Sequence, residues 1–92
     1  MAILMVSYDL GVPETSDTYK AFIEAIKSCG TTWAKPLKSQ FFIATTKSTA
    51  EVRDALKPFL DSNDHLLVIG VTSHWATTRV PPDVTEWMKE QI

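Results

Sequence analysis

Two short apolar runs, one near each end of the chain, constrain its fold more than any other feature. Residues 3–8 and 66–71 are each as long as an average strand and are dominated by aliphatic side chains, many of them β-branched. Successive residues of a strand point to opposite faces of a sheet, so a run that is apolar throughout needs cover on both sides. We therefore expect two interior strands in a sheet that has a packing partner on each face.

Two stretches between these runs change to the period of an α-helix. The first has apolar residues at Tyr19, Phe22, Ile23 and Ile26, and the second has them at Val52, Leu56, Phe59 and Leu60. This spacing predicts amphipathic helices over residues 17–29 and 48–60. Ser48 and Glu51 have the spacing of a capping box at the start of the second helix, and Pro58 predicts a frayed or kinked last turn.

Helix ends and isolated glycines carry further local signals. Ser16 or Asp17 can cap the first helix, and Gly30 follows it where a left-handed C-terminal residue is expected. Gly70 lies inside the last apolar run and predicts either a bulge or the close approach of another backbone.

The remaining segments predict a hairpin and a terminal helix. Residues 32–37 and 41–46 are strand-like and are joined by three residues, so they form a hairpin. Pro36 cannot donate a ladder hydrogen bond, which places the first hairpin strand at an edge of the sheet. Pro81 and Pro82 open a short final helix, because proline is tolerated in a first turn.

The element order is therefore β-α-β-β-α-β followed by a helix, in a single α+β domain over residues 1–92. This order predicts a ferredoxin-like sandwich whose four-stranded antiparallel sheet runs fourth, first, third, second strand, with two helices on one face. The other face must meet the terminal helix, a second subunit or a ligand, because the first and last strands are apolar on both sides. We expect a homodimer that packs through its sheet faces.

Charge and cysteine content limit the classes of partner. The chain of 92 residues has nine basic and eleven acidic side chains, for a net charge of −2. Broad binding to nucleic acid requires a basic excess, so nucleic acid remains a partner only through a local patch. The single cysteine, Cys29, excludes an internal disulfide and suits a reducing compartment. No apolar run is long enough to span a membrane, and the N-terminus lacks the pattern of a signal peptide, so we expect a cytoplasmic protein.

Asp9 is the leading candidate for chemistry. A carboxylate at the end of a buried strand can bind magnesium, especially where a second subunit supplies another carboxylate. The alternative is that Asp9 caps the turn that follows the strand. No spacing in the chain supplies a second acidic ligand, and we expect no cofactor and no catalysis.

Aromatic and basic residues form the other candidate set. Rings near lysine or arginine side chains can stack on bases, but packing in a core or a dimer interface is the favoured role for such rings. The candidate binding residues are Tyr8, Trp33, Lys35, His74, Trp75 and Arg79. No glycine-rich phosphate loop and no nucleophile elbow accompany them, and Cys29 at a helix end is expected to be an inert thiol.

Several short stretches resemble a known family. Residues 3–10, which end a strand with Asp9, resemble the first strand of the Cas2-like proteins, and 39–44 is similar to one of their later strands. Residues 6–10, 25–28, 52–58 and 60–64 are more similar to the small bacterial proteins labelled SinR-family. The resemblance implies a ferredoxin-like homodimer packed through its sheets.

The resemblance leaves the activity open. Cas2 proteins serve in CRISPR spacer acquisition, and some are metal-dependent nucleases in which the residue matching Asp9 holds a metal between subunits. Three readings follow: a dimeric binding domain without catalysis, a magnesium-dependent endoribonuclease or nuclease that uses Asp9, and a toxin–antitoxin component. The last rests on analogy of fold alone.

Overall fold

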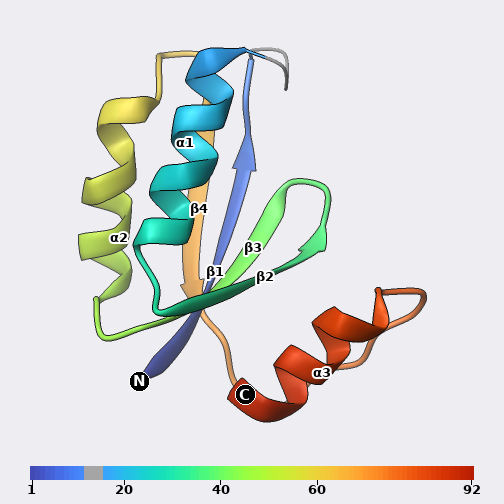
Figure 1. The fold of residues 1–92 in the computed structure, drawn as a ribbon. Helices are drawn as coiled ribbons and strands as arrows, with labels where there is room; N and C mark the ends of the chain where they lie inside the picture. Colours follow the sequence, from blue (N-terminus) through green and yellow to red (C-terminus); the bar gives the residue numbers. More distant parts are fainter. Residues whose placement is uncertain (12–15) are drawn as a thin grey trace.

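A four-stranded sheet with helices on both of its faces organises the chain. The structure is a computed structural model, and it describes residues 1–11 and 16–92 (Figure 1). The elements are β1 (Ala2–Asp9), α1 (Asp17–Ser28), β2 (Thr32–Leu37), β3 (Gln40–Thr45), α2 (Thr49–Leu56), the 3₁₀ turn η1 (Lys57–Phe59), β4 (His65–Gly70) and α3 (Pro82–Gln91).

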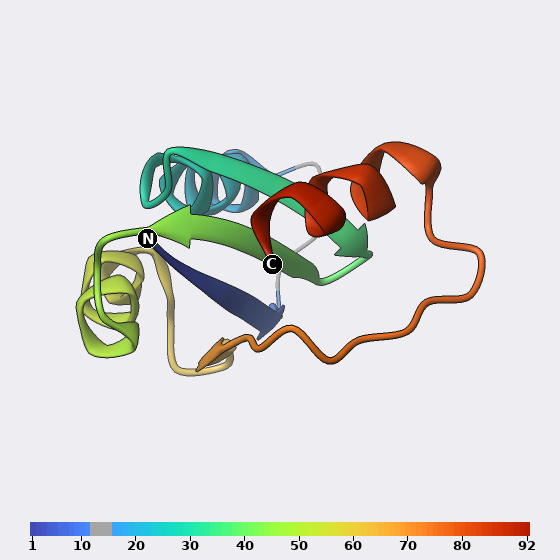
Figure 2. The same cartoon turned by 90° about the horizontal axis from the view of Figure 1, so that it is seen from below.

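Strand pairing follows the predicted order. The sheet runs β2-β3-β1-β4, and all three neighbouring pairs are antiparallel. Helices α1 and α2 lie on one face, and α3 lies on the other (Figure 2). The architecture is α+β and is compatible with a small ferredoxin-like fold. The expected terminal helix is present as α3, and it covers part of the second face.

Two hydrophobic clusters sit on opposite faces of the sheet, which explains the apolar runs. The helix-side cluster joins β1 and β3 to α1 and α2; its buried members include Val6, Phe22, Ile43 and Leu56. The α3-side cluster is smaller and contains Ile3, Ala34, Phe42, Ala44, Val84 and Met88. Neighbouring residues of β3 alternate between these two clusters, as the two-residue period of a strand requires.

Capping of α1 and α2 by serine side chains is confirmed. The Ser48 hydroxyl accepts from the Glu51 amide at 3.1 Å, and the Glu51 carboxylate accepts from the Ser48 amide at 2.9 Å. Ser16 caps α1 by accepting from the Tyr19 amide at 3.0 Å. The α-helical part of the second helix ends at Leu56, and Pro58 lies in η1, so the helix is shorter than the predicted 48–60.

The expectation of a left-handed Gly30 is wrong, and Gly70 lies in a regular ladder without a bulge. No described glycine has a positive φ, and Gly30 instead allows close packing, since a Cβ there would lie 2.9 Å from the Ile43 Cβ. At Gly70 a Cβ would meet no atom of the described chain within 4 Å, so the space on that side of the strand is open. The left-handed residue of the described chain is Arg79, with φ of 60°.

Candidate binding face

The terminal helix covers only part of its sheet face. The Trp87 ring stacks on Phe42 with centroids 6.0 Å apart, and its Nε1 donates to the Thr32 Oγ1 at 3.0 Å. These contacts fix α3 over the β2–β3 half. The extended segment that follows β4 leads across this side of the molecule to α3 (Figure 2).

The β1–β4 half of the same face is less covered, and its most exposed apolar side chains lie on β4; Met5 and Ser7 of β1 beside them are half-buried. Leu67 is 56% exposed and Ile69 is 39% exposed, and both point away from α1 and α2. Their cross-strand partners in β1 are Ser7 and Met5, respectively. We call this surface, formed by Met5, Ser7, Leu67 and Ile69, the bare half-face. A soluble monomer usually hides such a patch, so it is a candidate interface.

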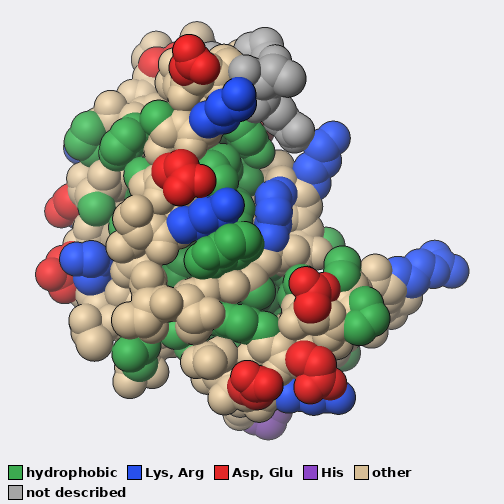
Figure 3. Space-filling view, in the orientation of Figure 1, with side chains coloured by type: hydrophobic (Ala, Val, Ile, Leu, Met, Phe, Trp, Pro, Cys, Tyr) green, Lys and Arg blue, Asp and Glu red, His purple; other side chains and the backbone are tan. Residues whose placement is uncertain are grey.

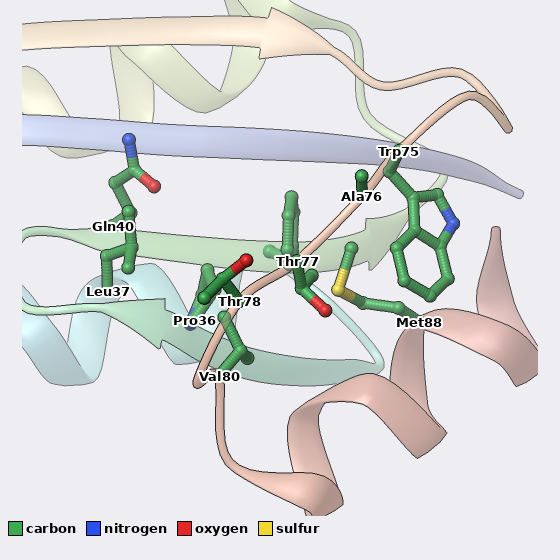
Figure 4. Close-up of a pocket in the computed structure, with 10 residues that line it drawn as sticks. Pro36, Leu37, Gln40, Trp75, Ala76, Thr77, Thr78, Val80 and Met88 are labelled. Carbon is green, nitrogen blue, oxygen red and sulfur yellow. The ribbon is translucent and has the colours of Figure 1, made fainter.

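A groove of about 320 Å³ lies on the covered half of this face, beneath residues 75–80 (Figure 4). Trp75 and Met88 lie near each other at one end, and Leu37 and Gln40 lie at the other. Phe42 lines the groove between strand and helix. The other lining residues are Pro36, Ala76, Thr77, Thr78 and Val80. The lining contains no charged side chain, so the groove suits an uncharged group and offers no acid or base.

Asp9 lies at the end of β1 on the bare side and is exposed. It pairs with His65 of β4 in the ladder, and both residues line a depression of about 270 Å³ together with Leu67. Among residues 1–11 and 16–92, no three His, Cys, Asp or Glu side chains are grouped so that they could hold a metal ion. Of the described residues, Asp9 and His65 bring one carboxylate and one imidazole to this depression.

Tyr8 lies in the helix-side core. Its side chain is 7% exposed, and its ring meets Phe22 edge-on with centroids 5.2 Å apart. Its hydroxyl lies 3.4 Å from the Tyr19 hydroxyl and 3.5 Å from the Lys38 carbonyl oxygen. Alternation along β1 sends Tyr8 and Asp9 to opposite faces, so these two candidates do not share a site.

Trp33 and Lys35 lie on the edge strand β2, on the helix side. The Lys27 ammonium lies 4.4 Å from the centroid of the Trp33 ring, and the Lys35 ammonium lies 5.4 Å from that of Phe41. Lys35 also donates to the carbonyl oxygens of Leu37 and Lys38. Acidic and basic side chains are interspersed over this face of the molecule (Figure 3), which is unlike the single-sign field of a broad phosphate-binding surface.

The other candidates lie in the segment between β4 and α3. His74 and Arg79 are exposed, and Trp75 is half-buried against the α3-side cluster. Of the six candidate binding residues, Trp75 alone lines the groove. Sequence reasoning missed Gln40, Phe42 and Met88 there. The signal for Phe42 was the unbroken apolar run of residues 41–44, because successive residues of such a run supply apolar side chains to both faces of the sheet.

The Cys29 thiol is buried, and burial raises its pKa. The nearby Lys47 ammonium opposes this effect only in part. A raised pKa keeps the sulfur protonated and weakly nucleophilic at neutral pH. This agrees with the expectation of an inert thiol.

Comparison with known proteins found no relative of this chain. No protein-family model, curated protein or solved structure matches this chain. In the described part of the chain, none of the helices has the length and apolar content needed to cross a bilayer. The likeness to Cas2-like and SinR-family proteins remains a prediction from short sequence motifs.

Proposed function

We propose that this chain is a ferredoxin-like, Cas2-like domain that forms a homodimer through its sheet and acts by binding a partner. The observation that carries the proposal is the bare half-face. Helix α3 covers the β2–β3 half, while Leu67 and Ile69 remain 56% and 39% exposed beside it. Burying these side chains against a second copy removes apolar surface from water.

The small size of the domain supports the same conclusion. A chain of 92 residues buries a smaller share of its surface than a larger domain does, so a subunit contact adds usefully to its stability. The ion pairs of the described residues cannot substitute, because they are pairs between near neighbours at the surface, such as the exposed Lys89 and Glu86.

Light scattering at micromolar concentration tests the dimer. The wild type should give about twice the monomer mass of 10.3 kDa. Leu67→Lys should shift the protein to monomer, because it puts an ammonium in the apolar contact. Leu37→Lys is the matched control: Leu37 is also 56% exposed, but it lies at the β2–β3 turn, and this variant should remain dimeric. A wild-type protein that stays monomeric would refute the proposal.

A magnesium-dependent nuclease is the second candidate function, and the pairing of exposed Asp9 with His65 is the observation in its favour. The test is cleavage of single-stranded RNA and DNA with added magnesium. We expect no cleavage by the wild type and little change in stability for Asp9→Asn, because the amide keeps the acceptor that a turn requires. Metal-dependent turnover that Asp9→Asn abolishes would instead establish Asp9 as a ligand, since an amide lacks the charge that magnesium prefers.

A further inference from the structure

The two edges of the sheet differ in how they are protected from pairing. The β2 edge carries Lys35 and Pro36, and at these residues the ladder with β3 shifts register, between Ala34 and Leu37. Charges, proline and irregular pairing are the usual means by which proteins block an edge. β4 has none of them: its ladder with β1 is unbroken, and after His65 the strand reads Leu-Leu-Val-Ile-Gly.

The phase of the β1–β4 ladder shows which backbone groups face outward. The Val71 amide donates to the Ile3 carbonyl oxygen at 2.9 Å, so this pair is hydrogen-bonded. Hydrogen-bonded and non-hydrogen-bonded pairs alternate along an antiparallel ladder. Positions 65, 67 and 69 therefore turn their N–H and C=O groups toward β1. Leu66, Val68 and Gly70 turn theirs to the open edge, where they offer three donors and three acceptors.

We propose that a second copy of this chain adds its β4 to this edge, antiparallel and with Val68 opposite the partner's Val68, which makes one eight-stranded sheet. This inference rests on the proposed homodimer and specifies how its two sheets meet. Two copies that continue one sheet are related by a two-fold axis perpendicular to it, so each face continues into the same face. Outward residues must then pair with outward residues, and centring on Val68 sets Leu66 opposite the partner's Gly70. All outward groups of β4 are satisfied in this register.

The same register also brings the exposed apolar side chains of the two copies side by side. Leu67 falls opposite the partner's Ile69 in a non-hydrogen-bonded pair, where cross-strand side chains are closest. No carboxylate, lysine or arginine lies within β4, so no like charges face each other. On the helix side a notch of about 230 Å³ lies along β4, and Thr49, Ala50 and Arg53 of α2 line it. In the proposed dimer this notch faces the same notch of the partner.

Cysteine cross-linking tests this register. In a Cys29→Ala background, Val68→Cys should form a covalent dimer under mild oxidation. Hydrogen-bonded pairs have Cα atoms about 5.5 Å apart, within the range that a disulfide spans. Leu67→Cys and Ile69→Cys should each give no covalent dimer alone, because each residue lies only diagonally from the same residue of the second copy. The variant with both Leu67→Cys and Ile69→Cys should cross-link, because residue 67 lies opposite residue 69 of the second copy. Cys29→Ala alone is the control and should give none.

The outcomes separate this inference from the homodimer itself. If Leu67→Cys alone cross-links and Val68→Cys does not, the sheets stack face to face, which overturns the edge register but keeps the dimer. If light scattering shows only monomer, both proposals fail. If Val68→Cys does not fold, amide hydrogen exchange in the wild type tests the edge register instead. The amides of Leu66, Val68 and Gly70 should then exchange at least about tenfold more slowly in the dimer than after dilution to the monomer. Equal rates would overturn the edge register.

Discussion

Asp64 connects two segments that are distant in the sequence. Its Oδ1 accepts from the Gly11 amide at 2.8 Å, and its Oδ2 accepts from the Asp61 amide at 3.0 Å. These bonds, led by the one from Asp61, lower the pKa of the Asp64 carboxyl. The side chain thus ties the loop after β1 to the turn before β4.

Replacing Asp64 should therefore cost stability in a pH-dependent way. A carboxyl whose folded pKa is below its unfolded value of about 3.9 stabilises the fold above that pH, and the contribution is lost as the pH falls through the folded pKa. Asp64→Asn removes one acceptor and the charge, so it should lower the urea midpoint at pH 7. At pH 3 the difference from the wild type should shrink.

Urea unfolding at the two pH values measures this effect. Asp54→Asn is the control: it removes a carboxylate whose contact is the exposed ion pair with Arg53 at 3.0 Å, and such pairs contribute little. A midpoint for Asp64→Asn that equals the wild-type midpoint at pH 7 would show that the two loops are held by other contacts.

At the scale of elements, the capping box of α2 is the clearest test of local structure. Ser48→Ala removes the acceptor of the Glu51 amide, so we expect a loss of about 1 kcal/mol in the free energy of unfolding. Denaturant melts measure the loss. Ser62→Ala, at an exposed serine outside the helices, should have little effect. Equal losses for the two variants would contradict a capping role for Ser48.

The elements that sequence could predict are those whose signals are local. The capping box spans four residues, and the apolar residues of each helix recur every three or four positions. Pro36 marks an edge strand because it lacks an amide hydrogen, whichever residues surround it. The docking of α3 is different, because it depends on the Trp87–Thr32 hydrogen bond between residues 55 positions apart. The role of Asp64 escaped for the same reason, since Gly11 is 53 positions away.

The candidate site was predictable only in part. The runs in β1 and β4, which are apolar on both sides, indicated a second face that needs cover, and α3 covers that face only in part. The sequence could not predict which aromatic residues lie on that face. Tyr8 and Trp33 lie in strand-like stretches that look no different from the stretches that carry residues of the other face. Their side depends on the phase of each strand, which tertiary pairing sets.

At the scale of the whole molecule, the two clusters should differ in their resistance to opening. Trp87→Ala removes the stack on Phe42 and the bond to Thr32, so it should cost roughly 2 kcal/mol, less than a fully buried tryptophan. Amide exchange should accelerate most in α3, while the helix-side cluster keeps its protection. Trp33→Ala, at the 41% exposed ring beside Lys27, is the control and should not accelerate α3. Uniform acceleration would mean that both clusters open as one unit.

Strand β3 serves both clusters at once, and this has a consequence for how the sequence can vary. Phe41 and Ile43 fill one side while Phe42 and Ala44 fill the other, and all four are at most 7% exposed. A one-residue insertion upstream in this strand would exchange the two sets and spoil both interiors together. In a library of random variants, β3 should therefore accept fewer substitutions than any other segment. Over evolution, the sequence outside β3 should change faster than β3 itself.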